Sequence, residues 1–459
     1  MKIEINDFTE GKIVSHLILF SFPLIWGNFL QVFYNAVDSF WVGKFLGPRA
    51  LAAVSVSFPL IFALVSLMMG ISSATTTLVS QYFGAKKDED LNKTIFSSLF
   101  LSVAIGVLIT ILGMIFKRSL LNIVNVPWDV FSLADVYFSI CLLGFIPSFL
   151  YNIASAVLMG LGDSRTPVKI LGYSTLLNIV LDPVFIFGLG PIPPMGIKGA
   201  AIATVISQAF SAFLCVSCII KEKVLGLGGD SKVLTFREIK LLFRVGLPVG
   251  VQNLLISLGH VFLNALVNLF GSSVTAGFGA GVRVGSFAIL PAMSVGIAVA
   301  SLVGQNIGAG KEKRVREVVI WGSILGGGIS FCVTVVALTF SSELISLFTT
   351  DQKVIEEGVT FLKYDALGYV LFAIIFVLGG VFRGAGDTLA VMVMTIISMW
   401  GVRIPLAAYL SLKTSMGVEG VWMAMPLGAL TGLILQFLYY KLGLWRKRVI
   451  AVRSYGKES

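Results

Sequence analysis

Two carboxylates fall inside long apolar stretches of the chain, and both have polar neighbours at helical spacing. In FLQVFYNAVDSFWVG, Gln31, Tyr34 and Asp38 recur at i, i+3 and i+7, so they share one face of a helix. In LLNIVLDPVFIFG, Asp182 follows Asn178 by one helical turn. A carboxylate within a bilayer is energetically unfavourable, so its presence there indicates a functional site.

The chemistry open to these groups is the binding of a cation. Each of Asp38 and Asp182 could bind a proton, or Na⁺ together with the Asn178 amide oxygen and the Thr204 hydroxyl. Pro183 removes a backbone donor and disturbs its helix, which frees carbonyl groups near Asp182. Two structural alternatives stay open: Asp38 could cap a helix end, and Asp182 could make an interhelical hydrogen bond.

These residues need a membrane scaffold, and the composition predicts one. Of the 459 residues 56% are hydrophobic and 13% charged, whereas soluble domains carry about 25% charged residues. Long stretches without Asp, Glu, Lys or Arg cover residues 50–85, 95–116, 136–162, 199–220, 318–342 and 420–440. Each is long enough to cross a bilayer as a helix, and none alternates as a strand would. We predict an all-α membrane protein with twelve transmembrane helices.

The basic residues set the predicted topology. Most Lys and Arg residues fall on the side of the spans that holds both termini, which predicts cytoplasmic termini and a multi-pass protein of the plasma (inner) membrane. This asymmetry accounts for the net charge of +10, so no nucleic-acid partner is expected. The polar start MKIEINDFTE predicts that no cleavable signal peptide is present. The four cysteines fall within predicted spans and fit helix packing better than redox chemistry.

An internal repeat relates the two halves of the chain at a shift of about 224 residues. The motif SQYFGAKK (80–87) aligns with GQNIGAGK (304–311), and GLGD (160–163) aligns with GAGD (384–387). The glycines of GLGD and GAGD are expected to end helices, with their aspartates as cap or turn residues.

Each repeat contains six predicted spans, so both halves enter the membrane in the same direction. We predict two pseudo-twofold-related six-helix lobes around a central cavity, as in parallel-repeat transporters. The N-terminal lobe is predicted at residues 1–220, a cytoplasmic linker at 221–244, and the C-terminal lobe with a short basic tail at 245–459.

The second half lacks the paired carboxylates of the first. Where the first half has LDP, the second has RIP, which contains Arg403. The buried ionisable groups expected there are Arg283, Arg403 and His260, with no deep carboxylate. Asp365 is expected to form an interfacial pair with Lys363. This asymmetry predicts that the coupling site lies in the first lobe.

The order and duplication of these motifs resemble the multidrug and toxic compound extrusion (MATE) family over nearly the whole chain. The resemblance is carried by FPLIWGNFLQVFYNAVDSFWVGKFLGPRALAAVS, SQYFGAKK and GLGDSRTP, and by GLPVGVQN, GQNIGAGKEK, RGAGDT and RIPLA in the second half. It implies twelve helices in two lobes that exchange drug for H⁺ or Na⁺.

The resemblance also implies roles for individual residues. Asp38 matches the family's first-helix aspartate, Asn178 and Asp182 match the fifth-helix pair of the DinF-like branch, and Thr204 matches a sixth-helix threonine. The chain is closer to this branch than to the NorM-like branch, whose acidic residues on the seventh and tenth helices we expect to be missing. Gln31, Tyr34 and Asn152 are the residues expected to line the substrate cavity.

Together these features predict a cation-coupled multidrug efflux antiporter that exports organic cations or amphipathic compounds by alternating access. A flippase for lipid-linked oligosaccharide or other lipids, from the same broader superfamily, is the alternative; it would require more cationic residues in the cavity. No catalytic residues and no cofactor other than the coupling ion are expected, and HExxH and GxSxG motifs are absent from the sequence. The expected partners are small-molecule substrates and membrane lipids, and the expected state is a monomer.

Overall fold

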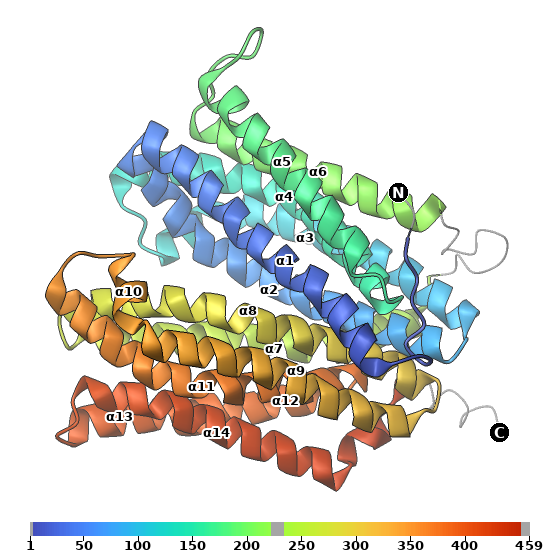
Figure 1. Ribbon diagram of the computed structural model, residues 1–459. Coiled ribbons are helices and arrows are strands. Elements are labelled where there is room, and N and C mark those ends of the chain that lie inside the picture. Colours follow the sequence, from blue (N-terminus) through green and yellow to red (C-terminus); the bar gives the residue numbers. More distant parts are fainter. Residues whose placement is uncertain (1–2, 222–233, 451–459) are drawn as a thin grey trace. The chain divides into compact units, whose positions relative to one another are not determined.

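The computed structural model describes residues 3–221 and 234–450, and all regular secondary structure in those ranges is helical. Twelve helices among the described residues are long and apolar enough to cross a bilayer, which confirms the predicted all-α membrane fold. Figure 1 shows these long helices running alongside one another within each half. Most of the predicted linker (222–233) and the end of the predicted basic tail (451–459) lie outside the described residues.

The first half consists of six long helices and one π-helical turn. They are α1 (Ile13–Trp41), η1 (Val42–Leu46), α2 (Pro48–Gly84), α3 (Asp88–Ile123), α4 (Trp128–Gly160), α5 (Arg165–Phe187) and α6 (Ile197–Lys221). The second half repeats this order with more interruptions. It consists of α7 (Phe236–Asn268), α8 (Ser272–Gly308), α9 (Glu312–Thr339), α10 (Ser341–Ser346), α11 (Gln352–Gly384), α12 (Thr388–Ile396), η3 (Ile397–Arg403), α13 (Ile404–Lys413), α14 (Val418–Leu442) and η4 (Leu444–Arg448).

Helix α3 shows how these sequences sort their residues in a membrane. Its large apolar side chains point outward, with Ile115 66% and Phe116 54% exposed. Its inward face carries small and polar residues: Gly106 and Gly113 contact α4 closely, and the Thr110 hydroxyl donates a 2.7 Å hydrogen bond to a carbonyl of α4. Small residues allow close helix packing in lipid, where apolar contact alone gives no preference for another helix.

Two spans contain π-helical segments. The segment η1 continues the first span immediately after α1, and η3 joins α12 and α13 into one span, Thr388–Lys413. A π-helical turn widens the helix locally and is frequent at functional sites. Asp38 lies one turn before η1, and Arg403 is the last residue of η3.

The described chain divides into two compact units. The first contains residues 3–6, 26–83, 87–221 and 234–250, and the second contains residues 7–25, 84–86 and 251–450. Helices α1 and α7 are therefore each divided between the units, at Ile25 and Gly250. The lobe boundaries expected from the sequence repeat stay a prediction.

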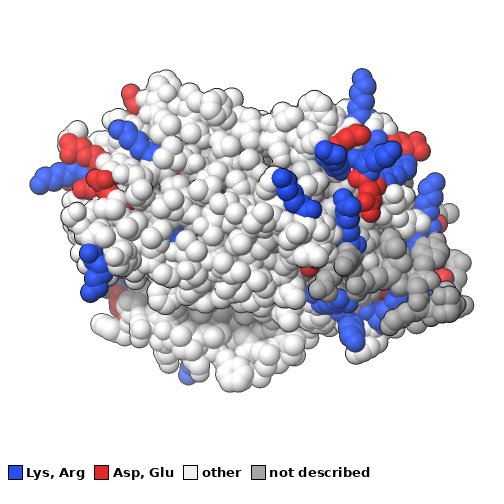
Figure 2. All heavy atoms as spheres, turned by 90° about the horizontal axis from the view of Figure 1, so that it is seen from below, with Lys and Arg blue, Asp and Glu red and all other residues white. Residues whose placement is uncertain are grey.

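Charged side chains are scarce in the middle of one face of the molecule. On the face shown in Figure 2, Lys, Arg, Asp and Glu gather at two ends, and the band between them is almost entirely uncharged. Such a band is what a bilayer requires, because charged groups are strongly disfavoured in its hydrocarbon core.

Candidate cation site in the first unit

The α5 segment places three polar side chains on one buried face. Ser174, Asn178 and Asp182 follow one another at intervals of one helical turn, and the last two are 0% exposed. The Ser174 hydroxyl donates a 2.6 Å hydrogen bond to the Ser207 carbonyl of α6. A β-carbon at Gly199 of α6 would lie only 2.4 Å from a carbonyl oxygen of α5. The backbones of α5 and α6 therefore touch, which fixes the helix that carries Asp182 against the helix that carries Thr204.

The two carboxylates lie within electrostatic range of each other, although α1 and α5 are far apart in sequence. Asp182 interacts with Asp38, and the Tyr34 phenol interacts with both. The Tyr34 phenol also lies beside Thr204 of α6, without the geometry of a regular hydrogen bond. The structure thus brings Asp38, Asn178, Asp182, Thr204 and Tyr34 together from three helices.

Most hydrogen-bond donors in this cluster donate to an acceptor, whereas several oxygens accept no hydrogen bond. The Asn178 amide donates to Asp182 Oδ1 at 3.2 Å, and the Thr204 hydroxyl donates to the Ala200 carbonyl at 3.1 Å. Four buried oxygens have no hydrogen-bond partner: Tyr34 Oη, Asp38 Oδ1, Asn178 Oδ1 and Asp182 Oδ2. A buried polar atom left unpaired costs roughly 1–3 kcal/mol, so this cluster favours the binding of a ligand.

The donor set fits a small hard cation or a proton. Carboxylate, amide and hydroxyl oxygens are the ligands that hard cations prefer. Asp38, Asn178, Asp182 and Thr204 would hold Na⁺, which would supply the missing partner for the unpaired oxygens. A proton shared by the carboxylates would reduce their mutual repulsion instead.

Two residues near Asp38 were not among the expected site residues. Tyr137 and Cys141 on α4 lie close enough to interact with Asp38, and Tyr137 is only 7% exposed. Both belong to one face of α4 at i and i+4, but apolar stretches contain many such pairs. Nothing in the sequence relates α4 to Asp38, so this contact was not predictable from spacing.

Two of the expected cavity residues lie apart from this cluster. Gln31 is exposed on α1. Asn152 is half-buried on α4, and its amide donates to the Ser148 carbonyl of the same helix at 2.8 Å rather than to the cluster. Their role as substrate contacts stays a prediction.

The second unit corrects one expectation. Asp365 lies in the middle portion of α11, so a carboxylate does lie within a span of the second half. Its carboxylate lies beside the Tyr369 hydroxyl and interacts electrostatically with Arg403, rather than with Lys363. A β-carbon at Gly285 would come within 2.8 Å of Asp365 Oδ2 and 3.2 Å of Tyr369 Oη. The expectation of an interfacial pair was therefore wrong, because charge adjacency in sequence does not show which way a helical side chain faces.

Arg403 belongs to the same interior cluster. It ends η3, and its β-carbon packs against Gly428 of α14, where an added methyl would lie 2.6 Å away. Its Nε is buried without a hydrogen-bond partner, and its charge interacts with His260 of α7.

The twelve long apolar helices among the described residues indicate a multi-pass membrane protein. The sequence model of the MatE family matches the chain twice, at residues 23–184 and 248–409, once in each half. The chain belongs to this family, the MATE transporters.

Individual relatives cover almost the whole chain. The probable multidrug resistance protein YpnP of Bacillus subtilis (strain 168) is 34% identical over 96% of this chain and 97% of its own. The probable multidrug resistance protein YoeA of the same organism is 34% identical over 94% of both chains. A solved structure described as the outward-facing conformation of a multidrug resistance MATE family transporter of the MOP superfamily has a TM-score of 0.89. It is 24% identical and covers 99% of this chain and 100% of that chain, which shows the shared fold.

Proposed function

We propose that the protein is a cation-coupled efflux antiporter that exports organic cations or other amphipathic compounds by alternating access, driven by H⁺ or Na⁺. The observation that carries the proposal is the group of four buried, unpaired oxygens on Tyr34, Asp38, Asn178 and Asp182. In a membrane such a group is unfavourable unless an ion occupies it during the working cycle.

The two carboxylates give a reason for exchange. When both Asp38 and Asp182 are ionised, the first unit presents two negative charges that attract a cationic substrate. A bound proton or Na⁺ lowers this charge and fills the unpaired acceptors, so the site then loses its attraction for the substrate. Because coupling between two ligands is reciprocal, substrate binding must in turn weaken the hold on the ion. This mutual exclusion is the thermodynamic requirement of an antiporter.

The substrate class rests on the chemistry of the first unit and on the relatives. YpnP and YoeA are both named as probable multidrug resistance proteins. Gln31, Tyr34 and Asn152 remain our proposed substrate contacts. A few polar groups among aromatic and apolar side chains suit amphipathic ligands of varied shape.

The proposed oligomeric state, location and ion requirement follow from this assignment. We infer a monomer in the plasma membrane with both termini cytoplasmic, no catalytic residues and no cofactor besides the coupling ion. A lipid flippase is not favoured, because the relatives are named for multidrug resistance and not for lipid transport. Asn178 and Asp182 support placement near the DinF-like branch. Asp365 lies on α11, which is the tenth of the twelve spans, and so supports the tenth-helix acidic residue of the NorM-like branch.

Transport by purified protein in liposomes tests the proposal. Efflux of a fluorescent organic cation should follow an imposed pH gradient or an imposed Na⁺ gradient, and the gradient that drives it identifies the ion. Protein-free liposomes are the control for leakage. Organic cations that move under neither gradient, together with movement of a labelled lipid, would contradict the assignment.

A further inference from the structure

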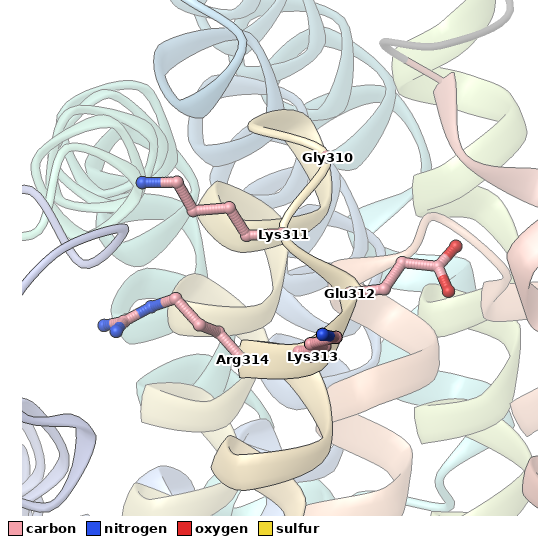
Figure 3. Close-up of a pocket in the computed structure, with 5 residues that line it drawn as sticks. All are labelled: Gly310, Lys311, Glu312, Lys313 and Arg314. Carbon is pink, nitrogen blue, oxygen red and sulfur yellow. The ribbon is translucent and has the colours of Figure 1, made fainter.

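The cations of the second unit differ in whether the chain uses their N–H groups. Figure 3 shows Lys311 and Arg314 projecting to the same side of the turn between α8 and α9, in the shallow surface pocket formed there. Lys311 Nζ donates to the Thr9 carbonyl at 3.0 Å. Arg314 Nη2 donates to the carbonyls of Phe8 and Glu10, each at 3.0 Å. Backbone carbonyls therefore bind both cations, which gives these cations a structural role.

Arg403 differs from these two cations, because the chain leaves its guanidinium without an acceptor. It lies deep in the span Thr388–Lys413, ahead of the 10 residues of α13. About 15 Å of helix therefore follows it before the span ends. Its Nε is buried without a hydrogen-bond partner, and no carboxylate of the described residues lies within ion-pair distance of it. A cation held in this way within a membrane span indicates a functional site.

Packing within the second unit holds the stem of the Arg403 side chain. A β-carbon at Gly428 of α14 would lie 2.6, 3.1 and 3.3 Å from Cβ, Cγ and Cδ of Arg403, so the stem lies directly against this helix. Helix α7 packs on η3, because a β-carbon at Gly259 would overlap the Met399 side chain. This packing brings the exposed His260 of α7 within electrostatic range of Arg403. The guanidinium is thus positioned from two helices, while its N–H groups stay available.

One carboxylate, Asp365 of α11, interacts with Arg403 from beyond ion-pair distance. Asp365 therefore lowers the electrostatic cost of the Arg403 charge without occupying the hydrogen-bonding positions of the guanidinium. The fork of N–H groups on an arginine matches the two oxygens of a carboxylate. A carboxylate from outside the chain would fill these positions.

The corresponding place in the first unit carries the opposite charge. The motif LDP (181–183), which contains Asp182, corresponds in the repeat to RIP (403–405), which begins with Arg403. Both charged residues lie within membrane spans. The duplicated segment thus suits a cation in the first unit and an anionic group in the second.

We propose that Arg403, with His260 nearby, binds a carboxylate group carried by the amphipathic compounds that the protein exports. The inference rests on the proposed efflux function and names one chemical group of its substrates. The bound carboxylate accepts from the N–H groups of Arg403, and the neutral imidazole of His260 offers a further donor. Compounds that carry both a cationic centre and a carboxylate are then preferred over their esters.

A rhodamine acid and its ethyl ester test this preference, because the two dyes share one xanthylium cation and differ only in the carboxylate. Equilibrium dialysis of each dye against the full-length protein in detergent, with protein-free micelles as the blank, gives the two affinities. Their ratio, acid over ester, cancels any effect of a substitution on the shared cation. The wild type should bind the acid at least about tenfold more tightly, because only the acid makes charge-assisted hydrogen bonds.

Substitutions should move this ratio in opposite directions. Arg403→Gln should bring the ratio to about one, and Arg403→Lys should give an intermediate ratio because it keeps the charge without the fork. Asp365→Asn should raise the ratio, since it removes a negative charge that repels the carboxylate. A raised ratio does not arise from misfolding, so Asp365→Asn and Arg403→Lys carry the test if Arg403→Gln does not fold.

Arg283→Gln is the matched control. Arg283 is an exposed arginine of the same unit, and its guanidinium lies 5.9 Å from the ring centroid of Phe348. Its substitution removes the same charge at another position and should leave the ratio unchanged.

A wild-type ratio of about one, no binding of the acid, or an unchanged ratio in Arg403→Gln would overturn the inference. Acid binding that is displaced by phosphatidylglycerol but not by a neutral lipid would assign Arg403 to a lipid headgroup and overturn the substrate assignment. Binding needs no gradient, so the expected ratios in a protein without gradient-driven efflux would contradict the proposed function and leave this inference intact. Gradient-driven efflux of both dyes with equal affinities would do the reverse.

Discussion

The side-chain amide of Asn178 donates a 3.2 Å hydrogen bond to Oδ1 of Asp182, one helical turn away, while Oδ2 of the same carboxylate stays buried and unpaired. One oxygen of Asp182 is thus held in place and the other is left to bind. This division is what an ion site needs, because the fixed contact orients the carboxylate and the free oxygen remains available.

Neutralising this carboxylate should not destabilise the fold. Asp182→Asn removes a buried charge but keeps the side-chain shape, so we expect a free energy of unfolding equal to or above that of the wild type, by up to about 2 kcal/mol. Thermal unfolding in detergent measures it. Asp129→Asn, at a partly exposed position 3.8 Å from Arg49, is the control and should change little. A large loss of stability in Asp182→Asn would show that its charge has a structural role.

Substitutions of Thr204 test whether the coupling ion is Na⁺ or H⁺. If Na⁺ binds with the Thr204 oxygen as a ligand, Thr204→Val should weaken Na⁺ binding about tenfold, which corresponds to about 1.4 kcal/mol. Thr204→Ser retains the oxygen and is the matched control. The Na⁺-dependent rise in melting temperature, with choline as the control cation, reports binding through linkage. A rise that is equal in Thr204→Val and the wild type would remove Thr204 from the site.

The interaction between Asp365 and Arg403 in the second unit should contribute to the free energy of unfolding. Asp365→Asn leaves the Arg403 charge without its carboxylate, and we expect a loss of about 1–3 kcal/mol, less than for a fully buried pair because both residues are half-buried. Adding Arg403→Gln should recover part of the loss, since no unpaired charge then remains. Losses that simply add in the double variant would show that the two side chains do not interact.

Acidification should destabilise the packing of the segment before α1, because the Asp7 carboxylate becomes protonated. Burial by itself would raise the pKa of Asp7, but hydrogen bonds from Thr9 and the charges of Lys311 and Lys86 outweigh it, so the pKa lies below the ordinary value of 3.8. A lowered folded-state pKa stabilises the fold above pH 3.8, and this contribution is lost as the pH falls through the lower value. The stability difference between the wild type and Asp7→Asn should therefore shrink as the pH is lowered from about 5 to about 3. A difference independent of pH would contradict this role.

The fold was largely predictable, because the lipid environment leaves a strong record in the sequence. Charge-free stretches longer than a bilayer crossing mark six of the twelve spans, and the repeat of SQYFGAKK as GQNIGAGK indicates the duplication that the family match confirms. The turn role of Asp163 was predictable too: its Oδ1 accepts the amides of Arg165 and Thr166, each at 2.9 Å.

The site was predictable only where its residues share one helix. The spacing of Asn178 and Asp182 on α5 indicated a common face, but nothing local showed that Tyr137 of α4 approaches Asp38 of α1. Asp365 was misjudged for a related reason: Lys363 is two residues away on a different face of the helix, whereas its partner Arg403 lies in another span. Long-range pairing depends on how helices pack, and a single sequence does not encode it in any short pattern.

Gradient-driven efflux by the pair of carboxylate variants tests the central claim most directly. Wild-type protein, Asp38→Asn and Asp182→Asn are reconstituted at equal density, and efflux of the same fluorescent organic cation is followed under the gradient that drives the wild type. The account predicts at least about a hundredfold loss of gradient-driven efflux in each variant, with thermal unfolding intact. Efflux at the wild-type rate in both variants would contradict a coupling site in the first unit and direct attention to Asp365.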